Sequence, residues 1–390
     1  MTLVTAYVQL RKGIPMTKTL IRIGGLGVLG VLLLFGLALT HVQAAPATQQ
    51  EATPEPIAIT SQQQCLDCHT APDQIMALPS GESLYLTIDG EAFAGSRHGQ
   101  EAIGCANCHS DITAFPHEPL AAQNLRQVAA SFSESCVDCH EEQATKQLDS
   151  IHQQMRDEGN EDAAVCSDCH NPHYTQLPSE PRSKIITTCA RCHSRIADEY
   201  RDSIHGAALL STENPDVPTC IDCHGVHNIP DPRTAQFLLK SPQICADCHS
   251  DGTRMAKYGV NTDVIDTYVA DFHGTTVTLF EQQSPDQLPN KPLCIDCHGV
   301  HNIKLITDTE STVIKQNLLA TCQKCHPEAT ANFPDAWLSH YTPSPQHNAL
   351  VYYVELFYRF FIPTVIGGMV VMVAVDMGRQ LANRLKGGKK

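Results

Sequence analysis

The sequence is poor in the residues that build an ordinary hydrophobic core. Aromatic residues make up 6% of the 390 residues, and tryptophan occurs once. Basic residues are also scarce, because 27 lysines and arginines stand against 42 aspartates and glutamates, a formal net charge of −15. This charge excludes a protein that binds nucleic acid through a basic surface. Alternating apolar and polar runs are limited to short pieces such as 275–280, so no extended β-sheet is expected.

Cysteine, in contrast, is abundant, and its arrangement leaves none for a disulfide. All 18 cysteines fall into nine Cys-x-x-Cys-His runs, called motifs 1 to 9 in chain order. This pentapeptide is the attachment signature of a c-type haem, which two thioether bonds hold above the histidine. The predicted attachment residues are Cys65, Cys68, Cys105, Cys108, Cys136, Cys139, Cys166, Cys169, Cys189, Cys192, Cys220, Cys223, Cys245, Cys248, Cys294, Cys297, Cys322 and Cys325. The predicted proximal iron ligands are His69, His109, His140, His170, His193, His224, His249, His298 and His326.

Zinc ribbons also use paired Cys-x-x-Cys, and they are the alternative for these motifs. Histidine supplies 20 of the 390 residues, so nine consecutive histidines directly after the second cysteine are not credible as coincidence. The motifs therefore predict haem c rather than zinc.

Each motif is followed by a further histidine, which predicts two axial imidazoles for each iron. His193 and His205 are twelve residues apart, about 18 Å along a helix, and His224 and His227 project in similar directions if their turn is helical. Neither pair suits opposite faces of one iron, so each second histidine is expected to reach a neighbouring haem. The candidate distal ligands are His98, His117, His152, His173, His205, His227, His273, His301 and, for the ninth iron, His340.

The motifs form a repeat of two alternating halves. A long half ends in a distant histidine, often within Ser-x-His or His-Gly, and a short half has a histidine close behind the motif, as in CIDCHGVHNI at 220–229 and 294–303. Strict alternation gives four two-haem units, units 1 to 4, and a half unit at motif 9. Motif 2 departs from this rule, because His117 follows it by eight residues. His117 is predicted to be a distal ligand, against the alternative of a surface histidine.

The expected fold class is mainly α: a loop-rich array of short helices around covalent haems, plus one carboxy-terminal transmembrane helix. The haem region offers about 31 residues for each haem, too few for a conventional core, so the haems are expected to form the apolar interior. Stretches 141–151 and 194–204 predict helices, whereas Pro172, Gly225 and Gly299 predict loops in the short halves.

The amino-terminal region predicts export. Residues 1–45 combine basic residues, an apolar run and a small-residue site at 42–44, which indicates a signal peptide or, alternatively, an uncleaved anchor. Residues 46–64, rich in Pro, Thr and Gln, predict a flexible linker before a nonahaem domain at 65–347.

The carboxy-terminal region predicts a membrane anchor. Residues 350–375 are apolar enough for a transmembrane helix, and the basic residues at 376–390 predict a cytoplasmic tail. The alternative is a buried helix of a soluble protein. The haem domain is then expected on the periplasmic or outer side of a bacterial or archaeal cytoplasmic membrane.

Residues 65 to about 340 resemble the multihaem c-type cytochromes with Ser-x-His-Gly-type distal histidines and Cys-x-x-Cys-His-x-x-His motifs. The resemblance implies nine covalently attached haem c groups and electron transfer between a membrane partner, a quinol-oxidising or b-type cytochrome subunit, and a periplasmic or extracellular redox protein. Nucleic acid is not an expected partner. Many quinol-oxidising members carry an amino-terminal anchor, so the carboxy-terminal anchor here favours a separate membrane subunit.

A different class is a multihaem oxidoreductase that acts on a small nitrogen or sulfur compound at a five-coordinate haem. Several multihaem reductases use a Cys-x-x-Cys-Lys motif, which this sequence lacks, but a non-binding His117 would leave one iron open. Bis-histidine ligation favours low potentials, so an electron-transfer protein or redox subunit is expected rather than a stand-alone enzyme, with no catalytic residue predicted. His347 is a replacement for His340, a quinol or partner contact, or an interfacial side chain.

Overall fold

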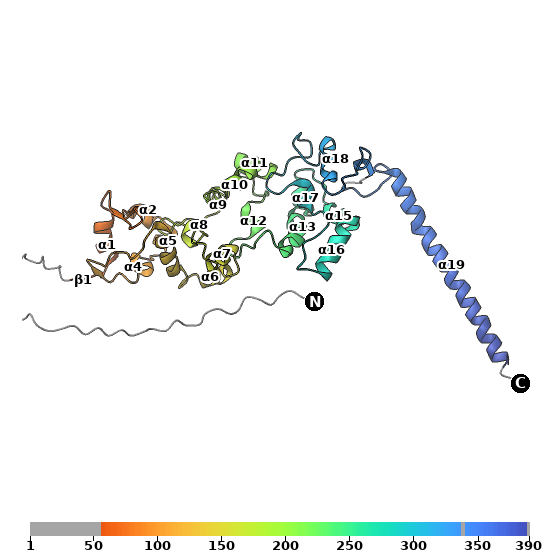
Figure 1. The fold of residues 1–390 in the computed structure, drawn as a ribbon, viewed down its shortest axis with the longest axis horizontal. Coiled ribbons are helices and arrows are strands. Elements are labelled where there is room, and N and C mark those ends of the chain that lie inside the picture. The colour runs from red at the N-terminus through yellow and green to blue at the C-terminus, as the bar shows by residue number, and fades with distance from the viewer. Residues whose placement is uncertain (1–55, 337–339, 388–390) are drawn as a thin grey trace, which may run out of the picture. The chain divides into compact units, whose positions relative to one another are not determined.

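The computed structural model describes residues 56–336 and 340–387, so the predicted export segment 1–45 lies outside the described residues. Within the described part, short helices and long connections predominate (Figure 1). This confirms the mainly α, loop-rich fold class. Folded elements begin before Cys65, because Ile57–Ala58 is a strand and a helix begins at Gln62.

In the described part of the chain, all strands lie in unit 1 or just before it. They are β1 (Ile57–Ala58), β2 (Ile75–Ala77), β3 (Ser83–Tyr85) and β4 (Ala114–Phe115). β1 pairs antiparallel with β4, and β2 pairs antiparallel with β3 in the register Ile75 to Tyr85.

The helices are short except for the last. Units 1 and 2 contain α1 (Gln62–His69), α2 (Gly90–Ala94), α3 (Arg97–Gln100), α4 (Cys105–Cys108), α5 (Leu125–Ser133), η1 (Glu134–Cys136), α6 (Glu141–Gln147), α7 (Ile151–Asp157) and α8 (Cys166–Cys169). Units 3 and 4 contain α9 (Lys184–Ala190), α10 (Ser194–Arg201), α11 (Ile204–Thr212), α12 (Cys220–His224), α13 (Ala235–His249), α14 (Gly252–Ala256), α15 (Val264–Ala270), α16 (Phe272–Gln283) and α17 (Cys294–His298). The rest of the described chain contains α18 (Lys315–Gln323), η2 (Pro334–Ala336) and α19 (Ala349–Gly387).

Motifs of the short halves form one-turn helices before their loops begin. In α12 and α17, Asp222 and Asp296 accept a hydrogen bond from the backbone N–H of the residue that precedes the motif, at 2.6 Å and 2.7 Å. Such a side-chain acceptor satisfies an amide that the first turn of a helix leaves free. Gly225 and Gly299 then adopt φ of 76° and 83°, where glycine is favoured, and turn the chain into the predicted loops.

The predicted helices at 141–151 and 194–204 begin where expected but end earlier, as α6 at Gln147 and α10 at Arg201. Ser150 and Ser203 adopt extended backbone angles and cap the next helices, α7 and α11. The predicted ends were wrong because helix propensity does not reveal a buried capping serine. The β-like piece at 275–280 lies inside α16 instead, where Val277 packs with Leu239 and Leu293.

Side-chain packing forms small clusters rather than one core. Leu78, Ala122 and Val128 form one in units 1 and 2. In unit 3, Ile186 and Leu209 are 1% and 0% exposed and pack with Ala197 and Tyr200. These patches agree with the expectation that the polypeptide does not supply the main apolar interior.

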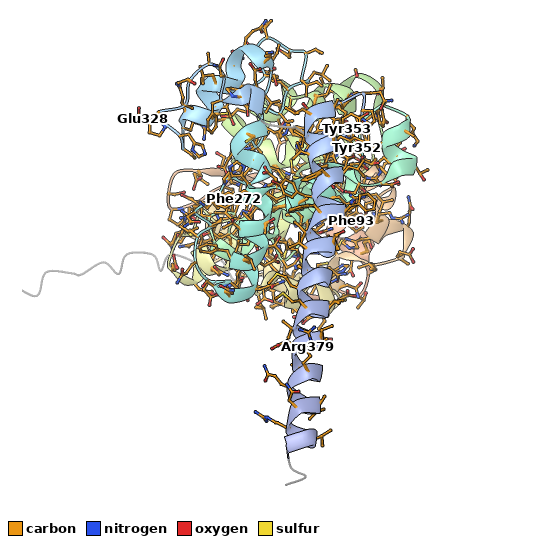
Figure 2. The ribbon with its side chains drawn as sticks, turned by 90° about the vertical axis from the view of Figure 1, so that its right-hand side faces the viewer. Phe93, Phe272, Glu328, Tyr352, Tyr353 and Arg379 are labelled. Carbon is orange, nitrogen blue, oxygen red and sulfur yellow. The ribbon has the colours of Figure 1, made fainter. Side chains whose placement is uncertain are left out.

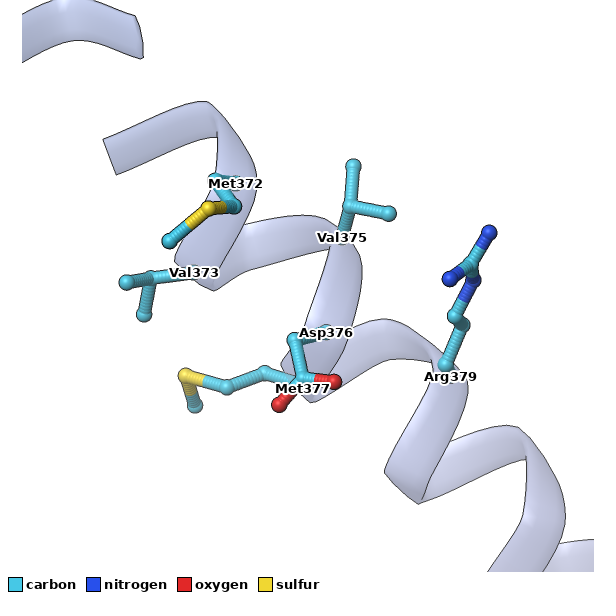
Figure 3. A pocket seen from close by; sticks show the side chains of 6 residues that line it. All are labelled: Met372, Val373, Val375, Asp376, Met377 and Arg379. Carbon is cyan, nitrogen blue, oxygen red and sulfur yellow. The ribbon is translucent and has the colours of Figure 1, made fainter. Parts of the chain in front are cut away.

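α19 is the one helix, in the part of the chain that the structure describes, that is long and apolar enough to cross a membrane. Its mean hydropathy is 2.0 over the best window, and none of that window is buried. Tyr352 and Tyr353 lie near its beginning and Arg379 near its end (Figure 2). The predicted tail is helical through Gly387. A shallow hollow between Met372 and Arg379 is lined by this helix alone (Figure 3) and forms no site.

Candidate functional site

The structure brings the motif histidines and the distal candidates together in nine ring pairs. In every pair one ring belongs to a motif and the other is a predicted distal ligand, and the ring centroids are 6.1 to 6.4 Å apart. The pairs are His69–His117, His98–His140, His109–His173, His152–His193, His170–His227, His205–His249, His224–His301, His273–His326 and His298–His340.

This spacing fits one metal ion between two imidazoles. With a metal–nitrogen bond of about 2.1 Å and about 1.1 Å from the nitrogen to the ring centre, trans imidazoles lie roughly 6.4 Å apart. Motif histidines contact phenylalanine rings at shorter distances, 4.8 Å for His109 with Phe132, 5.5 Å for His224 with Phe237 and 5.0 Å for His326 with Phe333. The nine pairs therefore have the geometry of axial ligands and are not stacked on one another.

Neighbouring units exchange their distal candidates. At the junction of units 1 and 2, His98 of unit 1 pairs with His140 of unit 2, and His173 of unit 2 pairs with His109 of unit 1. The same exchange joins His152 with His193 and His227 with His170, His205 with His249 and His301 with His224, and His273 with His326 and His340 with His298. At each junction, the distal candidate from the long half of the earlier unit pairs with a motif of the later unit. A distal candidate of the later unit pairs with the short-half motif of the earlier unit.

The two ends of the array complete this pattern. His117 pairs with His69 inside unit 1, with the ring planes 13° apart, so motif 1 also has a partner. His340 pairs with His298 of motif 8, whereas His326 of motif 9 pairs with His273. His340 therefore lies beside motif 8, which differs from the expectation that it serves the ninth iron, and the half unit takes part in the same exchange as a full unit.

Cysteines of consecutive motifs lie close together in space. Within each unit, the first thiols of the two motifs lie close enough to influence each other's ionisation: Cys65 with Cys105, Cys136 with Cys166, Cys189 with Cys220, and Cys245 with Cys294. Between units, Cys108 lies near Cys139, Cys169 near Cys189, Cys223 near Cys245, and Cys297 near Cys322. All 18 thiols are free of disulfides, so the attachment points of successive macrocycles are neighbours.

Burial lowers the pKa of several paired histidine rings and so keeps them in the neutral form that binds a metal. It lowers the pKa of His205 to about 4, and it also lowers the pKa of His109, His173 and His224. These rings are neutral near neutral pH, and a neutral imidazole has the lone pair that a metal needs. The thiols and the neutral rings together fit covalent haem c with two axial histidines.

A carboxylate lies beside one distal ring. The Oδ2 atom of Asp271 is 3.4 Å from Nδ1 of His273, which pairs with motif 9. An acidic neighbour on the outer nitrogen of a ligating imidazole increases its basicity. Asp271 was not among the residues predicted from the sequence, although it occupies the position of Ser in the Ser-x-His signal.

Glycine after a distal histidine has a steric reason. A Cβ atom at Gly99, Gly206 or Gly274 would lie 2.2, 1.9 or 2.1 Å from a backbone carbonyl oxygen, six residues earlier in each case. The chain can pass so close to itself only without a side chain. The recurring His-Gly pair was visible in the sequence, but its cause required the fold.

Two tyrosines tie the halves of a unit together. The Tyr200 hydroxyl donates to the carbonyl of Pro218 at 2.5 Å, and the Tyr268 hydroxyl donates to that of Pro292 at 3.0 Å. Burial raises the pKa of both phenols, which therefore stay neutral donors. Each tyrosine joins the helix before a distal histidine to the residues that lead into the next motif.

Ion pairs add to this link in units 2 and 3. Arg126 contacts Asp168 at 2.7 Å between partly buried side chains, and Arg182 contacts the exposed Asp222 at 3.0 Å. The two aspartates hold the same place, the third residue of their motifs. That shared place was the signal available in the sequence.

His347 is not part of any ring pair with a motif histidine. Its ring lies 5.2 Å from that of Tyr341, and its backbone N–H donates to Ser344. His340, seven residues earlier, occupies the position beside His298. The geometry thus gives no support to His347 as a replacement ligand.

Comparison with known proteins agrees with this site. Residues 158–198, which include motifs 4 and 5, match the family model of the doubled CXXCH motif. Over 170 residues the chain is 30% identical to the multiheme cytochrome MtrA of Shewanella baltica (strain OS185). The match covers 43% of this chain and 44% of that relative, less than half of either. The motifs, the ring pairs and these similarities together support a multihaem c-type cytochrome with covalently bound haem c.

Proposed function

We propose that the protein carries nine haem c groups, one at each motif, and relays electrons along them. The observation that carries this proposal is the set of nine histidine pairs, each spaced for one iron. The proposed ligand of each iron on its second face is the ring paired with the motif histidine. The haem bound at motif 1 is called haem 1, and so on to haem 9.

Haem supplies a one-electron ferric–ferrous couple, and two imidazoles favour low potentials. The chain contributes the spacing: its buried, neutral rings occupy both axial positions, and its adjacent cysteines hold successive macrocycles next to each other. Fixed ligands on both faces of an iron exclude substrate from it. This arrangement suits electron transfer better than catalysis at iron.

The proposed location is the cytoplasmic membrane of a bacterium or archaeon, with the haems on the periplasmic side. α19 supports an anchor, and the basic residues Arg379 and Arg384 at its end favour a cytoplasmic carboxyl terminus. The proposed electron partners are a membrane quinol-oxidising or b-type cytochrome subunit on one side and a periplasmic or extracellular redox protein on the other.

Counting haems tests the core of this proposal. A pyridine haemochromogen assay is expected to give nine haems per chain, and electron paramagnetic resonance (EPR) of the oxidised protein is expected to give low-spin ferric signals for all of them. Seven or fewer haems per chain would refute the scheme of one haem for each motif.

A multihaem oxidoreductase remains the second candidate because of one residue. His117 is exposed, whereas the other eight distal candidates are at least partly buried, so haem 1 has the least protected ligand. A substantial high-spin ferric signal that responds to nitrite or hydroxylamine would favour this second function. Low-spin signals that ignore both compounds would favour the electron carrier.

A further inference from the structure

A main-chain hydrogen bond crosses three of the four unit junctions at equivalent places. The residue just before a long-half distal histidine donates its N–H to the carbonyl two residues after a short-half distal histidine. These bonds run from Arg97 to Thr175 at 2.9 Å, from Ile151 to Ile229 at 2.8 Å, and from Ile204 to Ile303 at 2.8 Å. Each bond therefore joins the two chain segments that carry the exchanged distal candidates of one junction.

A buried serine stands directly before each donor. Ser96, Ser150 and Ser203 are 0%, 1% and 1% exposed. Each side chain caps the helix that carries a distal histidine, accepting from the backbone N–H of Gly99, His152 or Gly206 at 3.1, 3.3 and 3.0 Å. A buried capping oxygen fixes where the helix begins, and so where the histidine at its second position points.

We infer that the serine cap and the crossing hydrogen bond form a positioning device that sets two axial ligands at once. The inference rests on the proposed bis-histidine scheme and adds to it. At the junction of units 2 and 3, Ser150 orients His152 toward motif 5, and the bond from Ile151 to Ile229 holds the loop that carries His227 toward motif 4. The ligands of haems 4 and 5 are thereby coupled through the protein.

The fourth junction is built differently and offers a natural contrast. Asp271 replaces serine, and the N–H of Phe272 bonds to the Asp271 side chain at 2.7 Å instead of crossing to the half unit. His340 is held by other contacts, among them Thr267 Oγ1 at 3.4 Å from its Nδ1 atom. The device thus belongs to the junctions of haems 2 and 3, 4 and 5, and 6 and 7.

The crossing bond can be removed without breaking the helix. Proline has no N–H but is favoured at the first position of a helix, and Ser150, at φ −76° and ψ 142°, has the extended backbone that a residue before proline adopts. Ile151→Pro in the full-length holoprotein is expected to shift the EPR signals and reduction potentials of two of the nine haems. Ile151→Ala, which keeps the N–H and shortens the side chain, is the control and is expected to leave all nine in place.

The control for Ser150 is Ser311, a serine that is similarly buried and accepts a similar hydrogen bond. Ser311 is 2% exposed and accepts from the N–H of Val313 at 3.4 Å, two residues on, as Ser150 does from His152 at 3.3 Å. Ser150→Ala and Ser311→Ala are both expected to lower the melting temperature, but only Ser150→Ala is expected to shift the signals of two haems. Ser150→Thr, which keeps a hydroxyl acceptor, is expected to restore them.

Two negative results would have different meanings. If the wild-type protein shows nine low-spin haems while Ile151→Pro and Ser150→Ala match their controls, the serines are ordinary helix caps and this inference is wrong. If the wild-type protein itself lacks nine low-spin haems, the proposed ligand scheme fails first. A shift spread evenly over all nine haems would also overturn the inference, because a local device moves two.

Discussion

The proposed distal ligands differ in how firmly the surrounding chain holds them in place. His98, His152, His205 and His273 lie in the first turns of helices whose caps accept hydrogen bonds. His117 lies in a loop, is exposed, and has a local contact from its Nδ1 atom to the carbonyl of Glu118 at 3.2 Å. Haem 1 is therefore the member of the array with the least supported second ligand.

Replacing His117 tests its assignment. His117→Ala is expected to convert one haem of nine from low spin to high spin, because the pairing places no other distal candidate beside His69. EPR and the near-infrared spectrum of the oxidised protein measure the change. His347→Ala is the matched control and is expected to leave the spectrum unaltered; an unchanged spectrum in both variants would reject His117 as a ligand.

A glycine beside a distal histidine tests the close approach of the chain to itself. Gly206→Ala puts a Cβ atom 1.9 Å from the Tyr200 carbonyl oxygen, so the start of α11 must move. The free energy of unfolding is expected to fall by about 1–3 kcal/mol, the usual cost of overpacking. Thermal unfolding measures it, with Gly252→Ala as the control, because a Cβ atom there meets nothing within 4 Å. Equal melting temperatures for the two variants would contradict the close approach.

Among the elements, α19 has a composition that fits a membrane better than water. Sixteen uncharged residues separate Arg359 from Asp376, about 24 Å of helix, somewhat less than a bilayer core of about 30 Å. The pair of Glu355 and Arg359, in contact at 2.8 Å, then lies near one interface with Tyr352, Tyr353 and Tyr358.

Removing α19 tests the anchor. A chain that begins at Pro46, behind a cleavable signal peptide, and stops before Ala349 is expected to leave the membrane fraction and appear in the soluble fraction with the same number of haems, since none of the nine ring pairs involves α19. The full-length chain is expected to resist carbonate extraction and to need detergent. Extraction of the full-length chain by carbonate alone would show that α19 does not span the membrane.

At the scale of the whole molecule, the exchange of ligands makes the units interdependent. No motif is paired with the histidine that follows it, and at each junction both sides give one ring and receive one. The histidine that follows motif 1, 3, 5 or 7 pairs with the next odd-numbered motif, and the histidine that follows motif 4, 6 or 8 pairs with the preceding even-numbered motif. His340 pairs with motif 8 and His117 with motif 1, so the two ends of the array are closed. The array is therefore not a string of separate two-haem domains.

Cutting the chain between units tests this interdependence. A fragment that ends at residue 180 keeps motifs 1 to 4 but loses His227, the partner of His170. It is expected to bind four haems, of which three are low spin and one, haem 4, is high spin, as pyridine haemochromogen and EPR measure together. Four low-spin haems would mean that each unit completes its own ligands.

The sequence by itself determined the chemistry of attachment. Thioether bonds and the proximal ligand depend on five consecutive residues, so Cys65 to His69 and the other eight motifs are legible without a fold. Helical spacing also excluded a shared iron for His193 and His205, and the apolar run at 350–375 indicated α19. All of these are local properties of the chain.

The tertiary structure alone decided which ring faces which motif. Trans ligands approach an iron from opposite sides, so they come from segments distant in sequence, as His227 and His170 do, and no local pattern encodes their distance. It also decided that Ser150 and Ser203 are buried and cap the helices that begin after them, because burial depends on the folded chain and not on the local sequence. In the proposed scheme, the motifs fix where haem is attached, and the contacts between units fix how the irons are held.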